Sequence, residues 1–109
     1  MVRLNVVLKP GSLKDVDQLL DALRFVMSGT RLQPGCLGSS AWSDPDLTVH
    51  YVESWSSETD MRQHVMSPLF TSLLAIVESL RSPPHVQFDI VSASRGLDYV
   101  AEVRKERLD

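Results

Sequence analysis

Apolar residues occupy every second position of segment 2–8 and again of segment 86–90. This is the period of a strand with one buried face. Segment 47–55 is rich in β-branched and aromatic residues, and segment 36–43 alternates more weakly. The Asp-Pro-Asp triplet at 44–46 is a strong turn signal. The pattern therefore predicts four strands, and the middle two should pair as a hairpin.

Helical periodicity separates these strands. Segment 13–27 carries apolar residues at three- and four-residue spacing, with a serine before its start and Ser28-Gly29 as its expected C-terminal cap. Ser57 begins a short second helical segment. Ser67, followed by proline, begins a third that should end at the Ser-Pro-Pro triplet 82–84. The helices thus lie between the first two strands and between the last two.

The element order strand, helix, strand, strand, helix, strand predicts an α+β fold of the ferredoxin-like, split βαβ type. Helices should cover one face of an antiparallel sheet, and we expect the other face still to carry apolar residues that a second copy covers. We therefore expect a homodimer, since a chain of 109 residues forms one small core. We assign residues 1–95 to this domain. Residues 96–109 form a tail, whose apolar spacing predicts a helix packed on the partner.

Composition excludes several classes of protein. A formal net charge of −3 gives no excess of cations to neutralise phosphates, so nucleic acid is not expected as a partner. No apolar run approaches the ~20 residues that a membrane span needs. Cys36 is the one cysteine, and residues 1–3 lead straight into a strand-like pattern without a signal-peptide block. These features predict a cytoplasmic protein.

The side chains that could carry chemistry gather in one region. The sequence Tyr-Val-Glu-Ser-Trp at 51–55 is followed by His64 and Phe70, which brings an acid, an indole and an imidazole to the junction of a strand and two short helices. His50 and His85 have no second ligand at metal-binding spacing, so we expect no metal site.

Each of these residues has a functional and a structural interpretation. His64 is either a general base or a helix-end histidine bonded to backbone. Glu53 either takes part in proton transfer or accepts hydrogen bonds from a helix start. The aromatic residues form either a flat wall for an aromatic ligand or part of the core; they are Trp42, Tyr51, Trp55 and Phe70.

Several of these motifs, in this order, resemble the antibiotic biosynthesis monooxygenase domain family over residues 2–93. The motifs are Pro34-Gly35-Cys36-Leu37, Glu53-x-Trp55, His64, and Ser67 with Phe70. The resemblance implies a dimeric α+β barrel in which each protomer has a cleft between its sheet and its helices. It also implies oxygenation of a small aromatic phenol or quinol without a cofactor.

In that mechanism, His64 would take a proton and Glu53 would orient it, while the four aromatic residues would bind the ring. Two other functions stay open: an isomerase of a small polar metabolite, and a small-molecule-binding dimer without catalysis. Haem degradation ranks below them, because the haem-degrading branch has asparagine, tryptophan and histidine where this chain has Leu4, His64 and Leu74.

Overall fold

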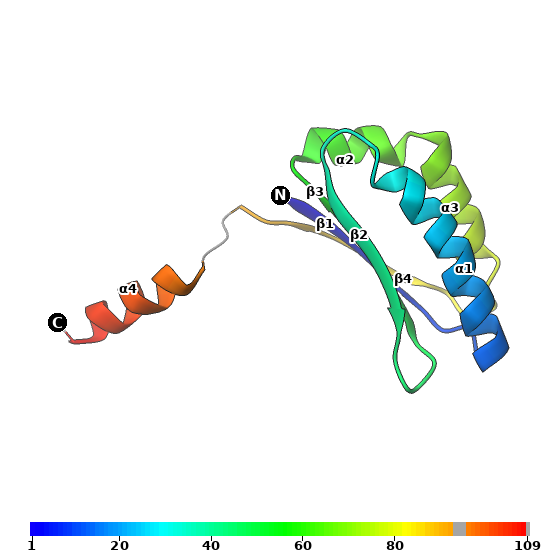
Figure 1. The fold of residues 1–109 in the computed structure, drawn as a ribbon, viewed down its shortest axis with the longest axis horizontal. Helices are drawn as coiled ribbons and strands as arrows, with labels where there is room; N and C mark the ends of the chain where they lie inside the picture. Colours follow the sequence, from blue (N-terminus) through cyan, green and yellow to red (C-terminus); the bar gives the residue numbers. More distant parts are fainter. Residues whose placement is uncertain (93–95, 109) are drawn as a thin grey trace.

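The computed structural model describes residues 1–92 and 96–108. Its elements are β1 (Val2–Leu8), α1 (Leu13–Thr30), β2 (Cys36–Ser43), β3 (Val49–Trp55), α2 (Glu58–Val65), α3 (Pro68–Glu78), β4 (His85–Ile90) and α4 (Leu97–Leu108). The strands form one antiparallel sheet in the order β2-β3-β1-β4. Helices α1, α2 and α3 cover one face (Figure 1). The predicted ferredoxin-like α+β fold is confirmed.

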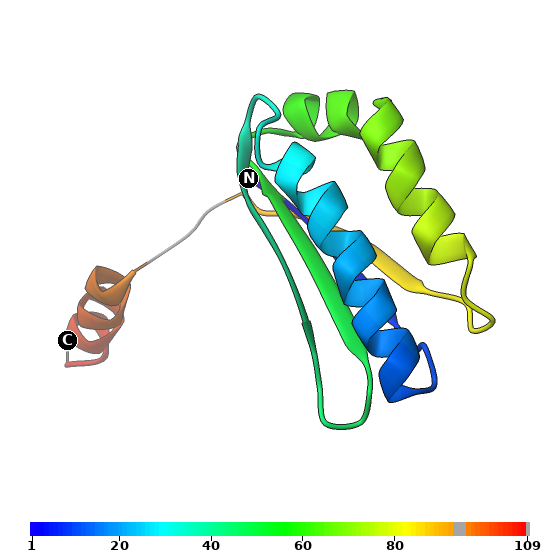
Figure 2. The ribbon, with the colours of Figure 1, turned by 45° about the vertical axis from the view of Figure 1, so that its right-hand side comes forward.

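The core lies between the sheet and the pair α1 and α3, which lie side by side across it (Figure 2). Alternate residues of β1 and β3 are buried, as the period-two pattern predicts. Apolar residues of the two helices meet them, including Leu19, Leu23, Leu73 and Val77. Each such side chain contributes about 1.5–3 kcal/mol through removal from water, so this layer holds the site's scaffold in place.

A serine caps the start of each of the first three helices. The side chains of Ser12, Ser57 and Ser67 accept the backbone N–H three residues later, at 3.1, 3.1 and 3.3 Å. Each bond satisfies one backbone donor that the helix itself leaves unpaired. The starts predicted from the sequence are therefore confirmed.

Helix α1 ends at Thr30, close to the predicted Ser28-Gly29, but its C-cap is Arg31 and not the expected glycine. Gly29 instead lies where α1 comes close to α3. A Cβ atom at this position would lie 3.0 Å from Cδ2 of Leu69, next to the start of α3. The missing side chain therefore allows α1 and α3 to approach each other closely.

The hairpin of β2 and β3 forms as predicted, but β3 begins at Val49 rather than at Leu47. Leu47 takes a positive φ of 68° in the turn, so it cannot join the strand. A bulge between Cys36 and Gly38 shifts the pairing at the other end of the hairpin. This register decides which side chains of β2 share a face with those of β3.

The face of the sheet away from the helices is mostly polar but still carries Val7, Val52 and Trp42, as expected, and its cover by a second copy stays a prediction. Strand pairing places twelve residues there in three rows: Gly38, Ser54, Arg3 and Asp89; Ser40, Val52, Asn5 and Gln87; Trp42, His50, Val7 and His85. Asn5 donates a hydrogen bond to Asp89 at 2.9 Å, and Gln87 donates to Asp89 at 2.8 Å. An antiparallel sheet can expose such a face to water.

Further exposed apolar side chains lie on the helix side of β4. Val86, Phe88 and Ile90 pair with buried residues of β1 and therefore share their face. They are nevertheless 48%, 42% and 66% exposed, because the helices do not cover β4. We call these three side chains the β4 strip.

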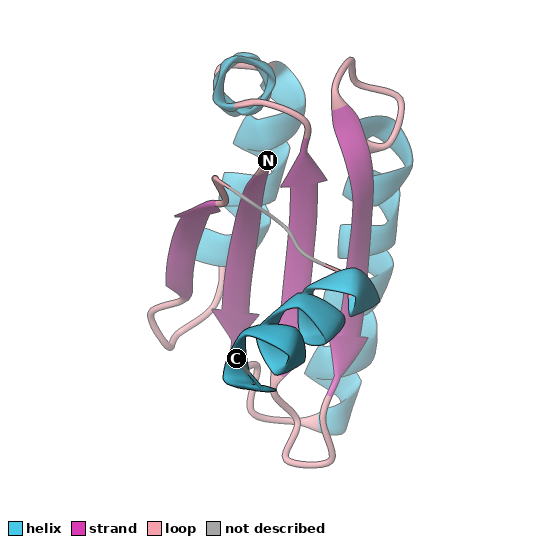
Figure 3. Cartoon of the chain, turned by 90° about the vertical axis from the view of Figure 1, so that its left-hand side faces the viewer, coloured by secondary structure: helices cyan, strands magenta, loops and turns pink. Residues whose placement is uncertain are grey.

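Helix α4 lies apart from the rest of the molecule, on the side of the sheet opposite to α1–α3 (Figures 1 and 3). All the side chains described in it, up to Lys105, are exposed. Its packing on a partner stays a prediction. Within residues 1–92 and 96–108, no helix has the length and apolar character needed to cross a membrane.

The turn before β2 should tolerate no side chain at Gly35. This residue has φ 82°, and an added Cβ would overlap the carboxylate of Asp60, which accepts hydrogen bonds from Ser56 and Ser57 at 2.8 and 3.0 Å. Gly11, at φ 92°, has no atom near such a Cβ and is a matched control. We expect Gly11→Ala to lower the free energy of unfolding by about 1–2 kcal/mol.

Gly35→Ala should cost about 1–3 kcal/mol more, because the carboxylate must also move. Urea unfolding of both variants measures the difference. Equal losses for the two variants would show that the Asp60 carboxylate does not restrict this turn.

Candidate functional site

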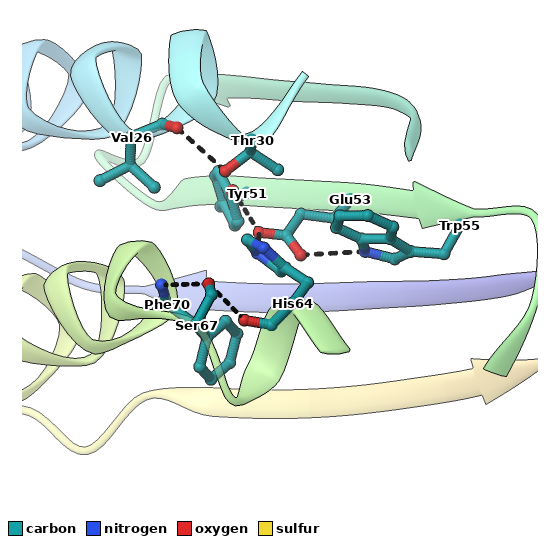
Figure 4. Close-up of polar contacts among 8 residues, drawn as sticks. All are labelled: Val26, Thr30, Tyr51, Glu53, Trp55, His64, Ser67 and Phe70. Atoms are coloured by element: carbon teal, nitrogen blue, oxygen red, sulfur yellow. Dashed lines mark hydrogen bonds and ion pairs between the residues drawn. The ribbon is translucent and has the colours of Figure 1, made fainter. Parts of the chain in front are cut away.

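The candidate site is a buried cluster where β3 ends and α2 meets α3 (Figure 4). Tyr51, Glu53 and Trp55 alternate along β3, so all three side chains point to the helix face of the sheet. His64 comes from the last turn of α2, and Phe70 from the first turn of α3. Each of these side chains is at most 7% exposed.

The carboxylate of Glu53 is the centre of this cluster. Tyr51 donates its hydroxyl hydrogen to Oε2 at 2.5 Å, and the indole Nε1 of Trp55 donates to Oε1 at 3.1 Å. Nε2 of His64 lies 3.1 Å from the same Oε2. A buried carboxylate is costly unless hydrogen bonds replace its water. Three partners do so here.

Neighbours hold the imidazole of His64 on several sides. The ring stacks on Trp55 at a centroid distance of 4.6 Å, and Phe70 meets it edge-on at 5.4 Å. The backbone carbonyl of His64 accepts hydrogen bonds from the N–H and the hydroxyl of Ser67, at 2.9 and 2.6 Å. The cap of α3 thus also fixes the end of α2.

Nδ1 of His64 is buried and has no hydrogen-bond partner among the described residues. Because a carboxylate only accepts hydrogen bonds, we assign the hydrogen of His64 to Nε2, which faces Glu53. In the neutral ring this leaves a lone pair on Nδ1. In the Glu53–His64 pair, the carboxylate therefore orients the imidazole, and Nδ1 is the atom that can act as a base.

Tyr51 keeps its proton and acts as a donor. Burial raises the pKa of its phenol above the usual value, and the negative charge of Glu53 raises it further. Burial also raises the pKa of the Cys36 thiol, so this cysteine has no activated thiolate.

The structure brings five of the six predicted site residues together, namely Tyr51, Glu53, Trp55, His64 and Phe70. The placement of Trp42 in the same wall is wrong. Trp42 pairs with His50 on the open face of the sheet and stacks on it at 5.2 Å. His50 in turn lies 2.6 Å from a carboxylate oxygen of Asp44. The bulge in β2 turns the side chain of Trp42 to the open face of the sheet. The weak alternation of apolar residues in segment 36–43 does not reveal this bulge.

Glu53 and His64 are sealed from water, at 0% and 1% exposure. A hollow on the same helix has a volume of about 480 Å³ and lies between α2 and β4. Its lining is Met61, Arg62, Val65, Met66 and Phe88. Sequence reasoning missed this hollow, although Met61 and Val65 share a helix face and Phe88 belongs to an alternating strand. A larger open groove, between the start of α1 and the end of α3, shares no residue with the site.

Within the part of the chain that the structure describes, no three His, Cys, Asp or Glu side chains group together as metal ligands. Leu4 and Leu74 occupy two of the positions that differ from the haem-degrading branch. Neither side chain can ligate iron or donate a hydrogen bond.

The sequence model of a family described as antibiotic biosynthesis monooxygenase matches residues 1–75. A crystal structure of an antibiotic biosynthesis monooxygenase aligns with a TM-score of 0.69 at 19% identity, covering 85% of this chain and 100% of that one. Rv0793 of Mycobacterium tuberculosis aligns with a TM-score of 0.71 at 19% identity, covering 87% of this chain and 98% of that one. NE2512 of Nitrosomonas europaea, a protein of unknown function, aligns with a TM-score of 0.69 at 19% identity, covering 87% of this chain and 92% of that one. Among curated proteins, none matches.

Replacing the carboxylate by an amide tests the role of Glu53. In Glu53→Gln the side chain keeps its shape, but its NH₂ group cannot accept a hydrogen bond from Tyr51, Trp55 or His64. We expect a loss of about 1–3 kcal/mol in the free energy of unfolding, from a buried donor left unpaired. Urea unfolding at neutral pH measures it, and Glu78→Gln at an exposed position of α3 is the control. A neutral effect would contradict the three-donor arrangement.

Tyr51 should make the folded state less stable at alkaline pH. Above about pH 10 the unfolded chain releases a phenolic proton that the folded chain retains, because the folded pKa is raised. Stability therefore falls as pH rises, by up to about 1.4 kcal/mol per pH unit. Unfolding free energies from pH 9 to 11 should fall less steeply in Tyr51→Phe. Parallel pH profiles would show that Tyr51 does not retain its proton.

Proposed function

This chain belongs to the antibiotic biosynthesis monooxygenase family, and from that premise we propose that it oxygenates a small aromatic phenol or quinol without a metal or flavin. One observation carries the proposal: the buried pair of Glu53 and His64, in which Nδ1 of the imidazole lacks a partner. A ligand that donates a hydroxyl hydrogen supplies that partner. Phenols and quinols are such ligands.

The proposed reaction begins with removal of a proton. Nδ1 of His64 accepts the phenolic proton, and the carboxylate of Glu53 stabilises the resulting imidazolium through Nε2–H. The deprotonated ring is electron-rich and supplies all the electrons that molecular oxygen needs, so one oxygen atom enters the product and the other leaves as water. The protein's part is to bind the ring, take the proton and exclude bulk water.

Substrate access is part of the proposal, because the pair is sealed. The hollow between α2 and β4 has apolar walls and a volume within the range of small-molecule sites. We propose that the aromatic ring binds there and that a shift of α2, an eight-residue helix, opens the way to His64. Met61 and Met66 line the hollow, and flexible methionines adapt to different ring shapes.

The protein is also proposed to be a cytoplasmic homodimer. The exposed β4 strip supports the dimer, since an alternating apolar strand face normally lies under a cover. The single cysteine, Cys36, forms no disulfide within the chain and fits a reducing compartment.

A second candidate is a dimer that binds a small molecule without catalysis. The sealing of Glu53 and His64 favours it, since a buried acid and base can also serve only to fix α2 against β3. An isomerase remains the other enzymatic alternative. It would need the same acid and base but no oxygen, so it should form product under anaerobic conditions.

Oxygen uptake with a panel of quinols and polycyclic phenols tests the proposed function. We expect His64→Gln to lower kcat/KM by about 100-fold or more, because proton transfer to a positioned base typically contributes that much. His85→Gln, at an exposed histidine of β4, is the matched control and should keep full activity. Uptake equal in both variants would remove His64 from the reaction. Binding of the panel without any uptake would favour the non-catalytic dimer.

A further inference from the structure

The β4 strip continues into the hollow between α2 and β4. Phe88 belongs to both, and Met66, at 78% exposure, borders them on the side of α2. The strip has the alternation of a buried strand, yet all three of its side chains are exposed in the single chain. An apolar surface of this kind marks a site of interaction. The helix layer therefore has room for a further helix over β4.

The side chains of α4 that the structure describes, residues 97–105, are exposed in the single chain. Leu97, Val100 and Val103 recur every three residues along it and are 83%, 49% and 43% exposed. A helix of 12 residues is marginal in water without tertiary packing. Its length, about 18 Å at 1.5 Å per residue, matches the six residues of β4, about 20 Å at 3.4 Å per residue.

The course of the chain directs α4 away from its own β4 strip. The pairing of β1 and β4 extends past Ile90, because Met1 and Val91 exchange two backbone hydrogen bonds, of 2.7 and 3.2 Å. The chain therefore stays paired with β1 beyond the end of the strip, as far as Val91. Helix α4 then lies on the opposite side of the sheet from α1–α3 (Figure 3).

We propose that α4 packs on a second copy of this chain, with Leu97, Val100 and Val103 against the β4 strip of that copy. The inference rests on the homodimer proposed above and names the segment that each copy exchanges. A reciprocal exchange buries the apolar side chains of α4 and of the β4 strip in both copies of a closed two-fold dimer. Each α4 then becomes the outermost helix of the partner's helix layer.

The exchange has a consequence for the hollow. Its wall consists of α2 on one side and Phe88 on the other, and it is open to solvent in the single chain. An α4 that covers Phe88 of the partner closes this open side. Each ligand chamber is then completed by the other copy, and a dissociated monomer should bind aromatic ligands more weakly.

A pairwise disulfide test locates α4, in a background of Cys36→Ser. One chain carries Val100→Cys, the other carries Phe88→Cys, and the two are co-expressed. We expect a disulfide-linked pair of chains on a non-reducing gel. Phe25→Cys replaces Phe88→Cys in the control, because Phe25 is an apolar residue of α1 at 76% exposure, outside the strip. No link should form there.

A chain that carries both Val100→Cys and Phe88→Cys distinguishes the alternatives. A link within one chain would overturn the proposal, since α4 would then cover its own strip. Failure to link in a protein that light scattering shows to be a dimer would also overturn it, while leaving the homodimer intact. Neither readout uses substrate, so a protein without oxygenase activity can still pass the test.

Association strength gives an independent measurement. Val100→Asp should weaken dimerisation by more than about tenfold, because the exchange would bury an unpaired charge. Phe25→Asp, an equivalent change outside the proposed interface, should leave the dimer unchanged. Sedimentation equilibrium measures both, and circular dichroism checks that the variants stay folded. Equal association of the two variants would contradict the exchange.

Discussion

The buried carboxylate of Glu53 is the constraint around which this end of the molecule is organised. A charge out of contact with water is tolerated only when hydrogen bonds replace that water. The three partners come from β3 itself and from α2, so strand and helix must hold one relative position. The cap at Ser67 extends this arrangement to α3. The hydrophobic layer between α1, α3 and the sheet sets the fold, and Glu53 sets where α2 lies on it.

Most of the fold follows from periodicity, because its causes are local. Alternation along β1 and β3 and the serine caps of α1, α2 and α3 depend on residues near one another in the chain. The errors arise where distant contacts decide. Gly29 lies inside α1 rather than at its cap, at the point where Leu69 of α3 comes close to it. A single sequence does not show which strand a residue will face.

The candidate site was predictable to the same extent. The period of a strand places Tyr51, Glu53 and Trp55 on one face, and the next helix follows closely enough for His64 to reach them. Trp42 was misplaced because one bulge in β2 moves each later side chain to the other face. The hollow at Phe88 was missed because it joins α2 to a strand more than twenty residues further along the chain.

The unpaired Nδ1 of His64 is the feature that structural stability alone does not explain. Tyr51, Glu53, Trp55 and Ser67 all find partners, and only this nitrogen of the cluster has none. A buried polar atom without a partner costs about 1–3 kcal/mol, and such a cost persists where function requires it or where a bound molecule offsets it. The structural role of position 64 uses only Nε2, which bonds to Glu53 and holds α2 against β3. Nδ1 is therefore the atom of the imidazole that this structural role leaves unused and that the proposed substrate would engage.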